Sequence, residues 1–144
     1  MGSSLRIGEG IMAVSDPVAD FLTRIRNASR AQRRFVVIGW SKLKEGIAEI
    51  LKAQGFIESY LIEKDENHRG IIRVYLKYTE RRESVIKGLE RVSKPGLRRY
   101  VGHDDIPFFY GGLGLSILST SQGLLPGGEA KKRKIGGELL CRVW

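Results

Sequence analysis

Residues 15–30, SDPVADFLTRIRNASR, combine a helix start signal with the periodicity of an amphipathic helix. Ser15 or Asp16 can cap the first turn, and Pro17 suits the first helical position, where its missing N–H is not needed. Four apolar side chains follow the spacing of one buried stripe: Val18, Phe21, Leu22 and Ile25. The pattern predicts a helix over about residues 16–31. Its solvent face is polar and basic, with Thr23, Arg24, Arg26, Asn27 and Arg30.

Further elements follow this helix within residues 12–78. A short strand, RRFVVI, precedes a second helix that Ser41 can cap and that Gly55 can end in the left-handed conformation. Two strands come next, separated by KDENHRG, whose Asp, Asn and Gly suit a hairpin loop. These strands are expected at residues 57–63 and 71–78. The first part of the chain therefore predicts a helix-strand-helix-strand-strand unit.

The second part of the chain, residues 85–144, predicts a mainly antiparallel sheet with short helices. The charged segment 79–84 has no apolar periodicity and is expected to be a linker. Two strands should flank the Lys94-Pro95-Gly96 turn, and Asp104 or Asp105 should cap a short helix. A buried strand LSILS, at most two helical turns in GEAKKRK and a terminal strand ELLCRVW complete the unit. The fold class is α+β in two small domains, with residues 1–11 expected to be a disordered extension.

Composition narrows the classes of partner. Twenty-five Lys and Arg against 16 Asp and Glu give a formal charge of +9, which favours polyanions and above all nucleic acid. No apolar run reaches the roughly 18 residues of a membrane-spanning helix, so no membrane partner is expected. Cys141 is the single cysteine, which excludes an internal disulfide and zinc sites with two or more thiolates. A single cysteine fits a protein of the reducing cytoplasm best.

Three consecutive hydroxyl residues, Ser119, Thr120 and Ser121, raise the question of catalysis. A serine nucleophile needs a base held by a third group, yet only His68 and His103 are available and no G-x-S-x-G elbow is present. No phosphate-binding loop motif occurs, and the carboxylates show no spacing typical of a metal site. We therefore expect no enzyme, no metal, no cofactor and no small-molecule substrate.

The same hydroxyl run suits contact with RNA. Hydroxyls donate and accept hydrogen bonds, Gly123 lets backbone approach closely, and cations with an aromatic ring can add phosphate contacts and stacking. The candidates are Ser119, Thr120, Ser121, Gln122 and Gly123, with Lys94, Arg98, Arg99, Tyr100, Lys131, Lys132, Arg133 and Lys134. Plainer interpretations stay open. The hydroxyl run can be a strand end with local turns, the basic run of residues 131–134 a solvated helix face, and Tyr100 a half-buried core residue. The whole chain can also be a basic protein-interaction module.

Four segments carry a family resemblance. DPVADFLTRIRNA (16–28), RVSKPGLRRYVG (91–102), GLGLSILSTSQG (112–123) and IGGELLCRVW (135–144) occur in this order. Together they closely resemble the bacterial small-subunit ribosomal protein eight family, over nearly all of the chain after residue 11.

The resemblance implies a cytoplasmic protein of the ribosome that binds a stem in the central domain of small-subunit ribosomal RNA during assembly. Neighbouring ribosomal proteins are implied as further partners, and some family members also repress their own operon by binding its messenger RNA. The implied RNA contacts fall on the hydroxyl loop, on Tyr100 and Glu138, and on the turn Lys94, Pro95 and Gly96. Arg24, Asn27 and Arg30 of the first helix are implied contacts to a second RNA segment.

Two segments depart from the family pattern. LLPGGEA, with Pro126, Gly127 and Gly128, replaces a Thr- or Ser-Asp helix cap, so the short helix should begin later or be less well capped. Gly39-Trp40 replaces a more typical proline-containing entry to the second helix. Neither departure lies in the hydroxyl loop.

Overall fold

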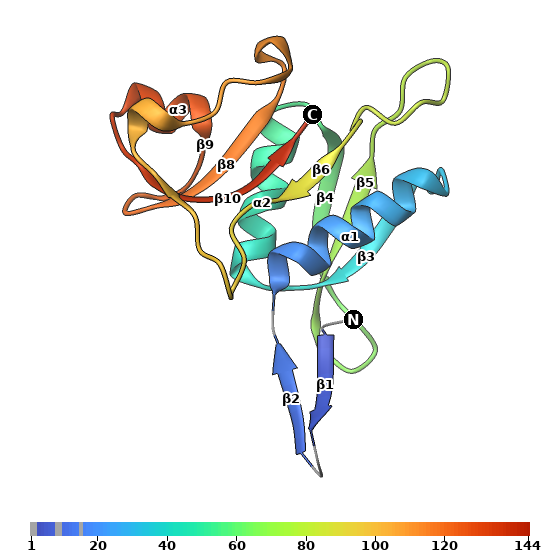
Figure 1. Ribbon diagram of the computed structural model, residues 1–144. Coiled ribbons are helices and arrows are strands. Elements are labelled where there is room, and N and C mark those ends of the chain that lie inside the picture. Colours follow the sequence, from blue (N-terminus) through green and yellow to red (C-terminus); the bar gives the residue numbers. More distant parts are fainter. Residues whose placement is uncertain (1–2, 8–9, 15) are drawn as a thin grey trace.

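The computed structural model describes residues 3–7, 10–14 and 16–144, and it has an α+β fold. Its N-terminal part is a three-stranded antiparallel sheet of order β3-β5-β4 with two helices (Figure 1). The elements are α1 (Pro17–Arg30), β3 (Phe35–Gly39), α2 (Lys42–Ala53), β4 (Ile57–Lys64) and β5 (Gly70–Leu76). The predicted helix-strand-helix-strand-strand unit is confirmed.

Local signals place both helices. The Asp16 carboxylate accepts a hydrogen bond from the backbone N–H of Ala19 at 3.1 Å, so Asp16 caps α1, while Ser15 lies outside the described residues. The Ser41 hydroxyl accepts from the Lys44 N–H at 3.1 Å and caps α2. Gly55 follows that helix with φ +82°. The predicted apolar stripe of α1 is buried: Val18, Phe21, Leu22 and Ile25.

Both helices cover one face of the sheet. Ile38, Ile72 and Val74 point into the core from neighbouring strands and pack with the helix stripes, because alternate residues of a strand face the same side. The opposite face of the sheet exposes Phe35 and Leu61, and no helix of the described residues covers it. The packed face supplies most of the hydrophobic burial that holds this part together.

The C-terminal part is built on a second antiparallel sheet of order β6-β10-β8-β9, with β7 also paired to β10. Its strands are β6 (Leu89–Arg91), β7 (Tyr100–Val101), β8 (Leu115–Thr120), β9 (Gly123–Pro126) and β10 (Gly137–Val143), and one short helix, α3 (Gly127–Lys132), packs on it. Figure 1 shows this sheet beside the N-terminal part, with α3 on its far side. The predicted strands flanking the Lys94-Pro95-Gly96 turn both pair with β10 and not with each other.

A bulge in β10 divides the core of this sheet. Leu139 pairs with Leu118 and Cys141 with Ile117, which leaves Leu140 as the extra residue. Leu139 and Leu118 pack under α3, whereas Leu140, Cys141 and Ile117 join the larger hydrophobic cluster that also contains the α1 and α2 stripes. The N-terminal and C-terminal parts thus share the larger cluster. The boundaries predicted at residues 12, 79 and 85 stay predictions.

The structure differs from the sequence expectations in three places. The helix expected after Asp104 or Asp105 is only two single 3₁₀ turns, at His103–Asp105 and Tyr110–Gly112, and neither turn has a side-chain cap. Ile106 is extended there because it precedes Pro107, which disfavours helical backbone. Strand β9 lies between the predicted strand LSILS and the predicted helical turns of GEAKKRK, where the sequence predicted no strand.

The third difference concerns the N-terminus. Residues 3–7 and 10–14 pair as an antiparallel hairpin, β1 (Ser3–Ile7) with β2 (Gly10–Val14), within the predicted extension and just beyond it. Residues 1–2 and 8–9 of that extension lie outside the described residues. Among the described helices, none has the length and the apolar character needed to cross a membrane.

Candidate nucleic-acid interface

Three predicted site residues lie in one row across the C-terminal sheet. Glu138 at the start of β10 is directly opposite Tyr100 of β7 on one side and Ser119 of β8 on the other. Tyr100 is 71% exposed, so it is not the half-buried tyrosine of the plainer interpretation. The pairing of three strands thus sets an open aromatic ring, a carboxylate and a hydroxyl side by side at one end of the sheet.

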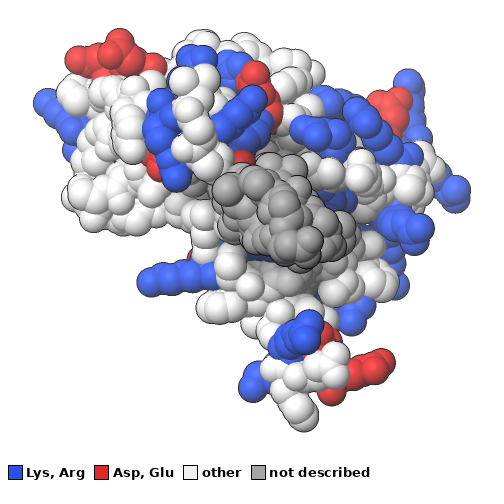
Figure 2. Space-filling view, turned by 60° about the horizontal axis from the view of Figure 1, so that its bottom comes forward, with Lys and Arg blue, Asp and Glu red and all other residues white. Residues whose placement is uncertain are grey.

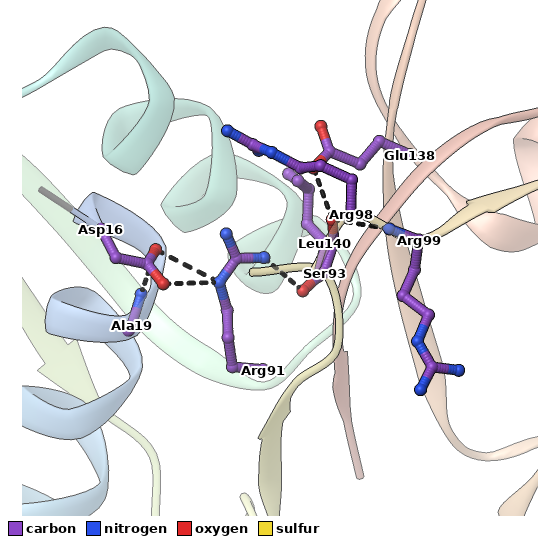
Figure 3. Close-up of polar contacts among 8 residues, drawn as sticks. All are labelled: Asp16, Ala19, Arg91, Ser93, Arg98, Arg99, Glu138 and Leu140. Atoms are coloured by element: carbon purple, nitrogen blue, oxygen red, sulfur yellow. Dashed lines mark hydrogen bonds and ion pairs between the residues drawn. The ribbon is translucent and has the colours of Figure 1, made fainter. Parts of the chain in front are cut away.

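Glu138 braces the loop that contains the Lys94-Pro95-Gly96 turn. Its Oε2 accepts hydrogen bonds from the Ser93 hydroxyl at 2.5 Å and from Arg98 Nη1 at 2.8 Å (Figure 3). The Ser93 Oγ in turn accepts from the Arg99 N–H at 3.1 Å. Burial alone would raise the pKa of Glu138, but these two hydrogen bonds and the charges of Arg98 and Arg91 outweigh it and lower the pKa. Glu138 is therefore an anion on β10 that lies beside a basic loop.

The tip of that loop is a tight turn. Backbone hydrogen bonds join Lys94 and Leu97 in both directions, at 3.0 and 2.9 Å. Lys94, Pro95 and Gly96 are exposed, as are Arg98 and Arg99. Since Arg98 is held by Glu138, Lys94 and Arg99 are the cations of this loop that have no ion pair in the described part of the chain.

The hydroxyl run forms the end of β8 and the turn into β9. The Thr120 hydroxyl donates to the Gly123 carbonyl at 2.8 Å and accepts from the Gln122 N–H at 3.0 Å, so this side chain shapes the turn itself. Gly123 has φ +95°, a conformation that side chains rarely adopt. Ser121 is exposed at the tip. The three hydroxyls therefore differ: Thr120 holds the turn, while Ser121 is presented to solvent.

Helix α3 brings a further group of cations to this turn. Arg133 Nη1 donates to Gln122 Oε1 at 2.9 Å, and Arg133 Nε pairs with Glu129 at 2.9 Å. Lys131 and Lys132 are exposed on the same short helix. The helix starts after Pro126 without a side-chain cap, as the departure from the family pattern predicted.

The predicted residues of α1 are not joined to this surface by any contact among the described residues. Arg24 pairs with Asp20 at 3.1 Å, while Asn27 and Arg30 are exposed farther along the helix, which runs away from the C-terminal sheet in Figure 1. They form a separate polar group. Two other links join α1 to the C-terminal sheet. Arg91 Nε contacts the Asp16 carboxylate at 3.1 Å (Figure 3), and Arg26 Nη2 donates to the Leu89 carbonyl at 2.6 Å.

Basic side chains outnumber acidic ones on the surface shown in Figure 2, as they do in the composition. Figure 2 shows blue Lys and Arg side chains in several groups across one face of the molecule, with a smaller number of red carboxylates between them. A surface of this kind attracts phosphates along its length rather than at one point.

Neither Ser93 nor the glycines before Glu138 were among the predicted site residues, although they lie in segments that carry the family resemblance. Ser93 has no exposed surface, and its partner Glu138 lies 45 residues away in the chain. A Cβ at Gly136 would lie 2.4 Å from the Val101 carbonyl oxygen, and a Cβ at Gly137 would lie 2.3 Å from the Ser119 carbonyl oxygen. Only glycine permits this close approach of three strands, so the Gly-Gly-Glu string was the available signal.

Comparisons with known proteins show the family of the chain. Residues 16–144 match the family described as Ribosomal protein S8. The chain is 66% identical over 133 residues to the small ribosomal subunit protein uS8 of Protochlamydia amoebophila, covering 92% of this chain and 100% of that protein. It is 50% identical to the protein of the same name from Syntrophobacter fumaroxidans and 51% identical to that from Streptococcus sanguinis, with the same coverage. The chain therefore belongs to the ribosomal protein S8 family.

Proposed function

We propose that this chain is a structural constituent of the small ribosomal subunit in the cytoplasm, and that it binds a stem in the central domain of small-subunit ribosomal RNA. Its family membership and the name of its relatives support the first part. The row of Tyr100, Glu138 and Ser119 is the observation that carries the second part.

Each member of the proposed surface has a task that its environment supports. The exposed ring of Tyr100 can stack on a base or pack against a sugar, and the Ser121 hydroxyl can donate to or accept from a base edge or a 2′-hydroxyl. Lys94, Arg99 and Lys132 can neutralise phosphates. Glu138 acts through the loop, because its two acceptor bonds already hold Ser93 and Arg98.

The remaining predicted residues have secondary tasks in this proposal. Gln122 and Arg133 hold each other at 2.9 Å and keep α3 against the hydroxyl turn. Arg24, Asn27 and Arg30 would contact a second RNA segment, because they lie on α1 apart from the main surface. A messenger RNA that presents the same stem would bind in the same way, and this is the route by which the chain would repress its own operon. We propose no catalytic role for the serines.

Salt-dependent binding tests the proposal. The purified protein is titrated with the central-domain stem and with an unrelated hairpin of equal length, at several salt concentrations. We expect stem-selective binding and a loss of about 1 to 3 kcal/mol for Ser121→Ala, since a buried RNA group would lose its partner. Ser59→Ala, on β4 of the N-terminal part, is the matched control and should bind like the wild type.

The alternative is a basic protein-interaction module. Such a module would bind both hairpins equally, or neither, and its interactions would depend weakly on salt. Equal affinity for the two hairpins together with indifference to Ser121→Ala would reject the proposed site.

A further inference from the structure

We propose that the groove between α2 and β9 binds a basic, partly apolar segment of a neighbouring ribosomal protein. This proposal rests on the proposed place of the chain in the small subunit. The groove has a volume of about 980 Å³ and lies where the N-terminal and C-terminal parts meet. Six apolar side chains line it: Trp40, Leu43, Ile50, Ala53, Leu124 and Pro126.

The two walls approach each other closely. A Cβ at Gly46 of α2 would lie 2.6 Å from Leu124 Cδ1, so glycine lets the helix sit against β9. Leu124 and Leu43 also pack against the larger core cluster. The groove is thus formed by well-packed elements, and an occupant would meet a preformed surface.

An exposed tryptophan stands at this groove. Trp40 is 47% exposed, yet its Nε1 donates to Glu45 Oε1 at 2.7 Å, and its backbone N–H donates to the Gly70 carbonyl at 3.0 Å. The indole is therefore held in one orientation with part of its ring open. A fixed, open indole is a favourable partner for an apolar side chain or for the stem and charge of a lysine or arginine.

The charge of the groove selects the occupant. Its lining holds two carboxylates, Glu45 and Glu49, against the single cation Lys42, although the whole chain has 25 basic and 16 acidic residues. In the described part of the chain neither carboxylate has an ion pair with Lys or Arg. Burial and then the charges of both carboxylates raise the pKa of nearby Tyr60, as a negative local potential does.

A negative groove repels phosphate and attracts cations, so it favours a protein segment with Lys or Arg over RNA. Ser119 and Gly123 also line the groove. A segment seated there would lie at the edge of the proposed RNA-binding surface. The geometry therefore fits a ribosomal protein that contacts this chain and the same region of RNA.

Photo-crosslinking in assembled small subunits tests this proposal. A photoreactive amino acid replaces Gln54, an exposed residue of the lining, and in a control it replaces Glu58, an exposed residue of β4 outside the groove. Mass spectrometry identifies the crosslinked partner. We expect position 54, and not position 58, to crosslink to a Lys- or Arg-containing segment of one ribosomal protein. Crosslinks from position 54 only to RNA, or to nothing, would overturn the proposal.

Charge substitutions sharpen the test. Glu45→Gln combined with Glu49→Gln keeps an acceptor for the Trp40 indole and removes both charges. We expect the yield of the position-54 crosslink to fall about fivefold or more, from two lost ion pairs, while Lys42→Gln does not lower it. An undiminished yield in the double variant would reject the charge argument.

The two proposals fail in different ways. If the chain does not enter small subunits or bind the RNA stem, the proposed function fails. If it does both and position 54 crosslinks no protein, only the groove proposal fails.

Discussion

The Ser93 hydroxyl donates a hydrogen bond to Glu138 across 2.5 Å, although 45 residues separate the two in the chain. Ser93 is fully buried, and it also accepts from the Arg99 N–H. This contact fixes the loop of residues 93–99 to the start of β10. It thereby sets where the exposed ring of Tyr100 stands.

Glu138→Ala should lower both stability and RNA affinity. The substitution leaves the buried Ser93 hydroxyl without its acceptor and releases Arg98, at a cost of about 1 to 3 kcal/mol in the free energy of unfolding. Denaturant unfolding and stem binding measure the two effects. Glu83→Ala, in an exposed pair with Lys87, is the control and should change stability by at most about 0.5 kcal/mol. Equal stability of the Glu138 and Glu83 variants would contradict the bracing role.

Tyr100→Ala should weaken stem binding by about 1 to 3 kcal/mol, the usual contribution of one stacked base, and Tyr100→Phe should retain most of the affinity. Because the ring is exposed, neither change should shift the melting temperature appreciably. The control is Tyr110→Ala, which removes another exposed tyrosine. Identical losses for Tyr100→Ala and Tyr110→Ala would argue against stacking at position 100.

Lys132→Ala should reduce the salt dependence of stem binding by about 0.9 in the slope of log K against log salt, for one phosphate contact to a duplex. Arg133→Ala should have a related effect and should also free Gln122, which Arg133 holds at 2.9 Å. Lys64→Ala at the exposed end of β4 provides the comparison. An unchanged slope would mean that Lys132 and Arg133 contact no phosphate and lie on a solvated helix face.

Gly137→Ala should destabilise the C-terminal sheet. The added methyl group would overlap the Ser119 carbonyl oxygen at 2.3 Å, and separating β8 from β10 should cost about 1 to 3 kcal/mol. Gly128→Ala in α3 meets no atom within 4 Å and should be neutral or slightly stabilising. Thermal unfolding of both variants checks the contrast, and a neutral Gly137→Ala would show that the strands can relax.

Asp20 should contribute to stability in a pH-dependent way. Burial raises the pKa of Asp20, but hydrogen bonds that include those from Lys44 and Arg24 lower it to about 2, from 3.8. The folded state therefore favours the carboxylate, so the stabilisation is complete above about pH 4 and is lost as the pH falls through about 2.

Unfolding of wild type and Asp20→Asn at several pH values measures this contribution. The wild type should exceed the variant by about 2 kcal/mol at neutral pH, and the difference should shrink below pH 4. Asp104→Asn, at a largely exposed carboxylate, should give no comparable difference. A difference that persists unchanged to pH 2 would point to a packing effect of the substitution.

Local chemistry predicted most elements of the fold. Asp16 and Ser41 cap helices, and Gly55 ends one, through contacts within a few residues of their own positions. The apolar stripe of α1 predicts which face of the helix is buried. Prediction failed where contacts with other segments of the chain determine the local secondary structure. Strand β9 contains Gly123 and Pro126, which favour a loop, yet pairing with β8 makes it an edge strand.

The sequence by itself determined the α+β class, the boundaries of the main helices and the residue types that suit RNA, because capping, periodicity and charge are local properties. Only the tertiary structure decided which of these residues meet. The bulge at Leu140 and the close approach at Gly137 set the register that aligns Tyr100, Glu138 and Ser119. The groove between α2 and β9 likewise needs two segments far apart in the chain. Such contacts depend on how strands pair and pack, and no local pattern encodes that outcome.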